Sequence, residues 1–241
     1  MLQTQTTLRS IALAQPATIR VFERFHLDYC CGGNRPLAEA CAQKGLALET
    51  VLAALAEATR SAEPARDFAQ ATSTELIEHI VQTHHAYVRA ELPRLLPMAG
   101  KVAAKHGPTH PEYIQIEAQL RQLASELNNH LSKEEIILFP YIEALEKSRS
   151  GVGSTPHACF PTVQSPIQAM MSEHEAAGAL LDEMRTSTQG FTPPEGACPT
   201  LVGLLDGIDA FEKDLHRHVH LENNLLFPMA IAMEKEVLAA R

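Results

Sequence analysis

The chain has 241 residues, of which 45% are hydrophobic and 5% aromatic, and its formal net charge is −9. This length can hold one large domain, or a main domain with a smaller one, and can bury a core without disulfide bonds. An acidic chain without a cluster of Lys and Arg is not expected to bind nucleic acid or an anionic membrane surface. No apolar stretch approaches the roughly 18 residues of a membrane-spanning helix, so no membrane partner is predicted.

The first residues, 1–7, lack the basic segment followed by an apolar segment that marks a secretory signal. The chain has five cysteines, an odd number, and two of them are adjacent. This usage is typical of free thiols in a reducing compartment rather than of a disulfide framework. We therefore expect a cytoplasmic protein.

Residues 1–66 are predicted to form a small helical domain that ends in a linker. Short apolar runs with helical spacing lie on both sides of Pro16 and recur twice further on. The glycine pair that follows Cys30 and Cys31 predicts a turn. The segment 61–66, Ser-Ala-Glu-Pro-Ala-Arg, has the composition of a linker.

Residues 67–241 are predicted to form four long helices. Apolar residues recur at helical spacing in four segments, which are separated by loops rich in Gly, Ser, Thr and Pro. Thr72 precedes Glu75 by three residues, a capping box that indicates the start of the first helix. Pro93 and Pro97 should kink or shorten its far end. The predicted fold class is all-α: an up-down four-helix bundle preceded by a small helical domain.

One histidine–glutamate pattern occurs twice, 88 residues apart (218 − 130 and 222 − 134). His130 and Glu134 are followed by Leu-Phe-Pro, and so are His218 and Glu222. At i and i+4 the two side chains of each pair lie on one face of a helix. An imidazole and a carboxylate presented twice are typical of a two-metal site inside a helical bundle.

The other two helices should supply further ligands. His174 is the candidate on the third helix. Shifting it back by about 88 residues gives position 86, and a one-residue difference in loop length reaches His85. His85 also continues the apolar face that carries Val81 and Val88. His84 is a close competitor, and periodicity alone does not exclude it.

Four imidazoles and two carboxylates in a bundle favour iron over zinc, copper or nickel. A carboxylate can bridge two metals, so Glu134 and Glu222 are the expected bridges between two iron ions. An oxo or hydroxo bridge would supply the remaining negative charge, and open positions would admit a small diatomic ligand. The predicted ligands are His85, His130, Glu134, His174, His218 and Glu222.

A second pair of acidic residues shares the repeat. Glu126 lies four residues before His130, and Asp214 lies four before His218 (214 − 126 is 88). Metal-bound histidines usually donate their second ring N–H to a carboxylate or a carbonyl. Glu126 and Asp214 are candidates for that role, or for controlling access to the site.

Two segments resemble known families. His85 to Pro93 matches the pattern His-x-x-x-Arg-x-x-Leu-Pro of the hemerythrin-like di-iron family, which favours His85 as the ligand. Residues 27–41, with Leu-Asp-Tyr-Cys-Cys-Gly-Gly, resemble the small N-terminal domain of the repair of iron centres family. The resemblance implies the six ligands named above and a cytoplasmic di-iron homodimer. Its clients would be iron–sulfur proteins damaged by nitric oxide or peroxide.

Three functions remain open at this point, and whether the protein is an enzyme depends on which of them holds. It could repair clusters by donating iron, reduce nitric oxide to nitrous oxide, or bind nitric oxide or dioxygen as a sensor or reservoir. Cys30 and Cys31 could pass iron, bind nitrosyl iron or relay electrons, because the thiolate is the reactive form of cysteine. They could also be inert thiols in a tight turn.

Overall fold

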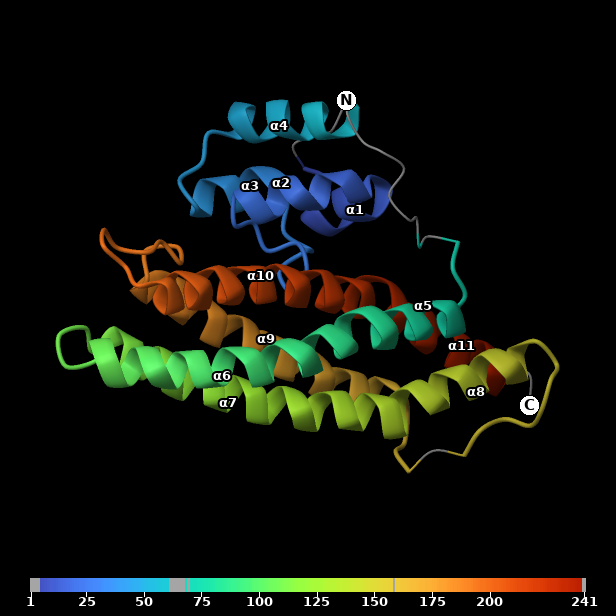
Figure 1. Cartoon of the computed structure of the whole chain (residues 1–241). Helices are drawn as coiled ribbons and strands as arrows, with labels where there is room; N and C mark the ends of the chain where they lie inside the picture. The colour runs from blue at the N-terminus through green and yellow to red at the C-terminus, as the bar shows by residue number, and fades with distance from the viewer. Residues whose placement is uncertain (1–4, 61–67, 69, 158, 240–241) are drawn as a thin grey trace.

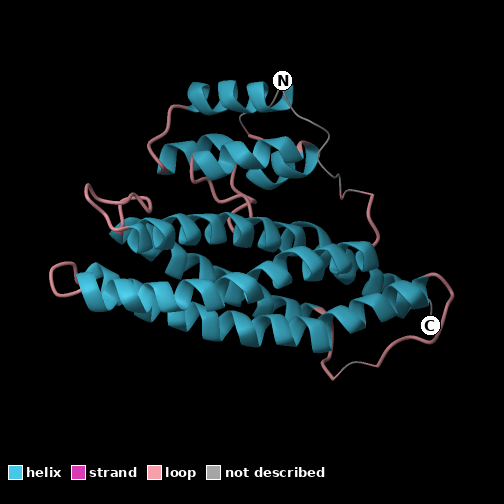
Figure 2. Cartoon of the chain, in the orientation of Figure 1, coloured by secondary structure: helices cyan, strands magenta, loops and turns pink. Residues whose placement is uncertain are grey.

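The computed structural model describes residues 5–60, 68, 70–157 and 159–239. Within these ranges the regular elements are all helical (Figures 1 and 2), as the sequence predicts. None of the described helices is long and apolar enough to cross a membrane. The predicted linker at 61–66 lies outside the described residues.

The N-terminal part is a compact group of short helices around its own apolar core. Phe22, Leu37, Val51 and Leu55 are fully buried there and pack in one cluster. Pro16 opens a 3₁₀ turn that separates the first two helices, because proline has no N–H to continue a helix. The elements are α1 (Leu8–Ala14), η1 (Pro16–Thr18), α2 (Ile19–Arg24), α3 (Leu37–Gln43) and α4 (Leu48–Arg60).

The remainder forms four long rods that run side by side (Figure 1), and three of them contain a π-helical segment. The first rod is α5 (Ser73–His79), η2 (Ile80–His85) and α6 (Ala86–His106). The second is α7 (Glu112–Lys133), η3 (Glu134–Leu138) and α8 (Phe139–Arg149), and the third is α9 (Gln164–Ser187). The fourth is α10 (Pro199–Leu221), η4 (Glu222–Leu226) and α11 (Phe227–Ala239).

The π-helical segments interrupt the first, second and fourth rods. In the second and fourth rods the segment ends two residues before Pro140 and Pro228. A proline lacks the N–H and crowds the carbonyl four residues earlier, so a regular helix would be interrupted there. A π turn accommodates one extra residue and often occurs at functional sites. The two Leu-Phe-Pro copies therefore mark matching irregularities in matching rods.

The first rod begins with the predicted capping box. The Glu75 N–H donates to the Thr72 hydroxyl, and the Glu75 carboxylate accepts from the Thr72 N–H. Of the two effects predicted for Pro93 and Pro97, a kink or a shortened helix, the shortening is wrong, because α6 continues through both prolines to His106. Buried apolar side chains along α6, Leu92 among them, pack into the bundle core and hold the helix together across the missing hydrogen bonds.

The bundle core consists of two apolar clusters, one towards each end. One contains Leu95, Ile116 and Ile208, and the other contains Ile142 and Met233. The π-helical segments lie where the two clusters meet. The polar interior of the bundle is therefore confined to its middle.

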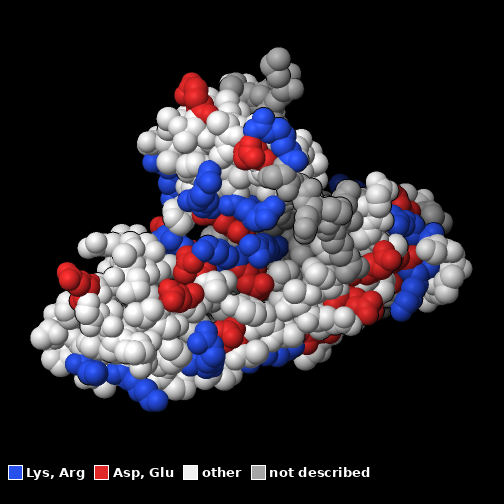
Figure 3. Space-filling view, turned by 45° about the horizontal axis from the view of Figure 1, so that its top comes forward, with Lys and Arg blue, Asp and Glu red and all other residues white. Residues whose placement is uncertain are grey.

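The small domain lies against α10 of the fourth rod (Figure 1). The Arg217 guanidinium donates to both oxygens of the buried Glu23 carboxylate, at 2.7 and 2.8 Å. Asn224 Nδ2 donates to the Tyr29 carbonyl at 3.1 Å, and the Arg9 guanidinium donates to the Asn224 carbonyl at 3.0 Å. Charged side chains of both signs gather along this junction (Figure 3).

Ile116→Ala tests the packing of the bundle core. Ile116 is 0% exposed, so its truncation should lower the free energy of unfolding by about 2–5 kcal/mol. The neighbouring exposed Gln115 is the matched control, and Gln115→Ala should change the free energy of unfolding by less than about 0.5 kcal/mol. Chemical denaturation of both variants is the measurement, and equal losses would contradict this packing.

Candidate metal centre

Six side chains from all four rods converge in the middle of the bundle. Each is 3% exposed or less. The two glutamates are the first residues of their π-helical segments, and one histidine is the last residue of the third such segment. The converging residues are the six predicted ones: His85, His130, Glu134, His174, His218 and Glu222.

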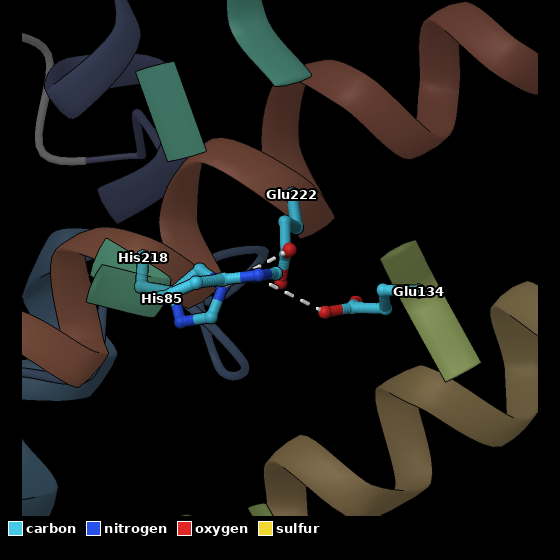
Figure 4. A group of neighbouring side chains, drawn as sticks. All are labelled: His85, Glu134, His218 and Glu222. Carbon is cyan, nitrogen blue, oxygen red and sulfur yellow. Dashed lines mark hydrogen bonds and ion pairs between the residues drawn. The ribbon is translucent and has the colours of Figure 1, made fainter. Parts of the chain in front are cut away.

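These residues form two groups that could each hold a metal ion. In each group the candidate ligand atoms lie within 4.8 Å of one another. Glu134 and Glu222 belong to both groups, and each histidine belongs to one. Figure 4 shows the group of His85 and His218, in which the two imidazoles and both carboxylates point towards one another.

The Glu134 carboxylate presents one oxygen to each group. Its Oε2 lies 3.4 Å from His85 Nε2, and its Oε1 lies 3.3 Å from His130 Nε2. This orientation lets one carboxylate serve two metal positions at once.

The Glu222 carboxylate has the same arrangement from the opposite rod. Its Oε1 lies 3.0 Å from His218 Nε2, and its Oε2 lies 3.2 Å from His174 Nε2. The two carboxylates thus face each other as a matched pair, which reflects the 88-residue repeat.

Three of the imidazoles hold their outer nitrogen against a polar partner. His85 Nδ1 lies 2.6 Å from Glu135 Oε1, and His130 Nδ1 lies 2.8 Å from Glu173 Oε2. Because a carboxylate only accepts, Nδ1 carries the proton and donates in both. An Nδ1–H tautomer leaves the Nε2 lone pair directed inward, the form in which imidazole binds a metal.

The interior atoms fit cations. His85 Nε2 and His218 Nε2 lie 3.2 Å apart, and His174 Nε2 and His130 Nε2 lie 3.0 Å apart. Neither oxygen of Glu134 accepts a hydrogen bond from the described residues. Buried lone pairs and carboxylates that face one another are costly unless positive charge lies between them. The donor set therefore matches metal ions that take nitrogen and oxygen ligands.

Without a metal, protons take part of this role. Burial lowers the pKa of His130, but the carboxylates of Glu134 and Glu222 outweigh it and raise the pKa to about 9. Burial raises the pKa of Glu222, yet His218 and His174 beside it hold that pKa well below its usual range. The two carboxylates thus stay ionised, and the His130 imidazole beside them holds its proton more tightly than free histidine does.

The partners predicted from the repeat differ from those observed. Glu126 is exposed and accepts from Gln122, so it does not hold His130. Asp214 Oδ1 lies 3.0 Å from His84 Nδ1 rather than against His218. The repeat could not locate these partners, because the observed partners come from a neighbouring rod rather than from one turn earlier on the same helix.

His84, the alternative to His85, lies outside the ligand groups. Its ring is stacked on that of His218, with 5.6 Å between centroids and 2° between planes. His218 Nδ1 is the one outer imidazole nitrogen of the four for which the described residues offer no hydrogen-bond partner. His84 thus packs over a ligand candidate instead of joining the site.

Sequence reasoning missed the residues that orient the imidazoles. A signal was present, because each is a direct neighbour of a predicted ligand. Glu135 follows Glu134, Glu173 precedes His174, and Asn223 follows Glu222. A polar residue beside a ligand points towards the adjacent rod, where it meets the ligand of that rod.

The two adjacent cysteines lie near the same centre but differ in exposure. Cys30 is buried, whereas Cys31 is partly exposed. The Asp28 carboxylate accepts from the N–H groups of both and from the Cys30 thiol. A hydrogen bond with Cys31, burial and Asp28 all raise the pKa of the Cys30 thiol. Cys30 is therefore held as a protonated thiol, and Cys31 is the accessible one.

A cavity of about 430 Å³ lies between the small domain and the bundle. Cys30 and Cys31 line it from the small domain, and His174 lines it from α9. Its other lining residues include charged side chains of both signs, such as Lys44 and Glu175. The cavity joins the cysteine turn to one of the candidate ligands.

Comparisons with known proteins agree with this architecture. Residues 76–230 match the family model described as Hemerythrin HHE cation binding domain, and residues 4–59 match a Domain of Unknown function (DUF542). Proteins of Yersinia pestis (strain Pestoides F) and Yersinia pseudotuberculosis serotype O:1b (strain IP 31758), each named iron-sulfur cluster repair protein YtfE, are 41% identical over 233 residues. Each alignment covers 95% of this chain and 97% of the relative.

Metal retention should separate the shared ligands from the others. Glu134→Gln removes a ligand of both groups, whereas His85→Ala removes a ligand of one. We expect Glu134→Gln to lose more metal per chain than His85→Ala after desalting, as measured by elemental analysis. The exposed His110 is the control, and His110→Ala should retain the wild-type content. Equal losses in the first two variants would contradict the shared role of Glu134.

The stability of the metal-free protein should depend on His130. Its pKa in the folded state, about 9, lies above the ordinary 6.5, so its protonation stabilises the fold. This contribution is complete below pH 6.5 and is lost as the pH rises through about 9. Thermal unfolding of the metal-free protein from about pH 6 to about pH 10 should show this decline in stability. His130→Asn should make stability depend less on pH over this range. An unchanged pH profile in that variant would show that His130 is not the group responsible.

Proposed function

The chain belongs to the repair of iron centres family of hemerythrin-like proteins, and from this premise we propose that it repairs damaged iron–sulfur clusters by donating iron. The printed name of its 41%-identical relatives supports cluster repair as the activity. The match to a cation-binding hemerythrin domain over 76–230 supports iron as the metal. Proteins whose clusters were damaged by nitric oxide or peroxide would be the clients.

The proposed centre holds two iron ions between the four rods. His85 and His218 would hold one ion, His130 and His174 the other, and Glu134 and Glu222 would bridge them. Iron there supplies a redox-active Lewis acid with positions left open for exchange. The orientation of one oxygen of each carboxylate towards each histidine pair supports this division.

The observation that carries iron donation is the cavity between the small domain and the bundle. Iron that leaves the His174 side would enter a space lined by Cys30 and Cys31. Cys31 would receive it, since a thiolate binds iron and Cys31 is the more exposed of the pair. Asp28 would keep the turn in place through its three N–H contacts, which include Gly32. The iron then reaches a client at the mouth of the cavity.

A second candidate function has one observation in its favour. Two ligand groups that share both carboxylates would hold two iron ions close together, and such a pair would supply neighbouring binding positions for two nitric oxide molecules, where proximity favours coupling of their nitrogens. Conversion of two nitric oxide molecules to nitrous oxide and water consumes two electrons and two protons. The reaction therefore needs an external reductant.

Reactivation of an iron–sulfur dehydratase damaged by nitric oxide tests the proposed function. The iron-loaded protein should restore activity, and Glu134→Leu should not. Cys31→Ser should slow the transfer, because the receiving thiol is lost, whereas the exposed Cys159 provides the control variant Cys159→Ser.

Iron counted in both proteins before and after incubation, under anaerobic conditions, distinguishes the two functions. Transfer of labelled iron to the client supports donation. Restored activity without iron transfer, together with nitrous oxide in the gas phase, would favour nitric oxide reduction instead. Reactivation that is equal for wild type and Glu134→Leu would rule out both.

A further inference from the structure

Asn223 connects the cysteine turn to the candidate metal centre. It is 8% exposed and follows Glu222 directly in η4. Its Oδ1 lies 3.0 Å from His174 Nδ1, and its Nδ2 lies 3.9 Å from Cys31 Sγ. One amide therefore contacts a ligand candidate with one atom and a thiol with the other.

The internal repeat has a different residue type at the position that corresponds to Asn223. Position 135 in the second rod corresponds to position 223 in the fourth (223 − 135 is 88), and there the chain has Glu135. Glu135 orients His85 as Asn223 orients His174, but its other contact is the Arg89 guanidinium. A carboxylate accepts only, so it suits a position between an imidazole N–H and a cation. An amide accepts and donates, so it suits a position between an imidazole N–H and a sulfur.

We propose that Asn223 is a positioning residue that couples the Cys31 thiol to His174, so that each senses the chemical state of the other. The coupling rests on the proposed metal site and goes beyond cluster repair itself. Cys30 does not take this role, because its thiol donates to Asp28 inside the turn.

The coupling follows from the polarity of the amide. A negative charge on Cys31 Sγ strengthens the bond from Nδ2, which polarises the amide and makes Oδ1 a stronger acceptor. A stronger hydrogen-bond acceptor at Nδ1 raises the basicity of His174 Nε2, which then donates its lone pair to a metal more strongly. An alkylated, neutral sulfur weakens the same chain of contacts. By thermodynamic linkage, a metal on His174 in turn favours a negative charge on the Cys31 sulfur.

The first measurement is the rate at which iodoacetamide alkylates Cys31 in the full-length, metal-free protein, followed by peptide mass spectrometry. Asn223→Asp keeps the shape and the acceptor but replaces the donor with a negative charge beside the sulfur. It should slow alkylation at neutral pH by about tenfold, the equivalent of one pKa unit. Glu135→Gln alters the hydrogen-bond acceptor of His85, which has no cysteine in contact with it among the described residues. This variant should leave the rate of Cys31 alkylation unchanged.

The second measurement uses cobalt(II) as a spectroscopic probe of the loaded site. Alkylation of Cys31 should shift the visible absorption of bound cobalt in the wild type and leave it unshifted in Asn223→Ala. Circular dichroism confirms that each variant is folded, and Asn223→Asp provides the isosteric alternative if the alanine variant is not. An unchanged alkylation rate in Asn223→Asp, or an equal cobalt shift in Asn223→Ala, would overturn the coupling. Neither readout involves a client protein, so cluster repair can fail while the coupling holds, and the reverse.

Discussion

Two carboxylates with no exposure to solvent, in the centre of a helical bundle, are the constraint on which the rest of this molecule depends. Burial of such charges costs several kcal/mol each unless positive charge lies beside them. Four imidazoles, turned so that their lone pairs face the carboxylates, leave room for cations in that place. The remaining core is apolar on both sides of this layer. Cations held there would offset the cost of burying the two carboxylates.

The same constraint explains where the helices are irregular. The glutamates begin the π-helical segments η3 and η4, and His85 ends η2. A π turn changes the direction of the side chains that follow it, so each rod can aim a ligand inward and still return its apolar face to the core. In the fourth rod, the same segment also places Asn223 and Asn224 against the small domain. One short stretch of chain therefore serves both the metal layer and the domain junction.

The sequence predicted much of this because the relevant information is repeated and local. An i, i+4 pair and a copy 88 residues later predict which faces of two helices meet, and the structure brings the six residues together. The capping box at Thr72 is equally local, and it is present. What failed depends on contacts between rods. Glu126 lies one turn from His130, yet the partner of His130 is Glu173 on another helix. The burial of Cys30 depends on the packing of two domains, which no local pattern records.

The repeat is imperfect, and the imidazoles of the first two rods differ chemically from those of the last two. His85 and His130 each have a carboxylate at Nδ1, His174 has a neutral amide, and His218 has no partner among the described residues. An imidazole whose second ring N–H donates to a carboxylate is a stronger electron-pair donor to a metal than one without such a partner. Each histidine pair combines one strong donor with one weaker donor, and the weaker donors both belong to the half of the chain nearer the small domain. The two ligand groups are therefore balanced in the strength of their imidazoles, and the inequality lies within each group, between an imidazole from the first two rods and one from the last two.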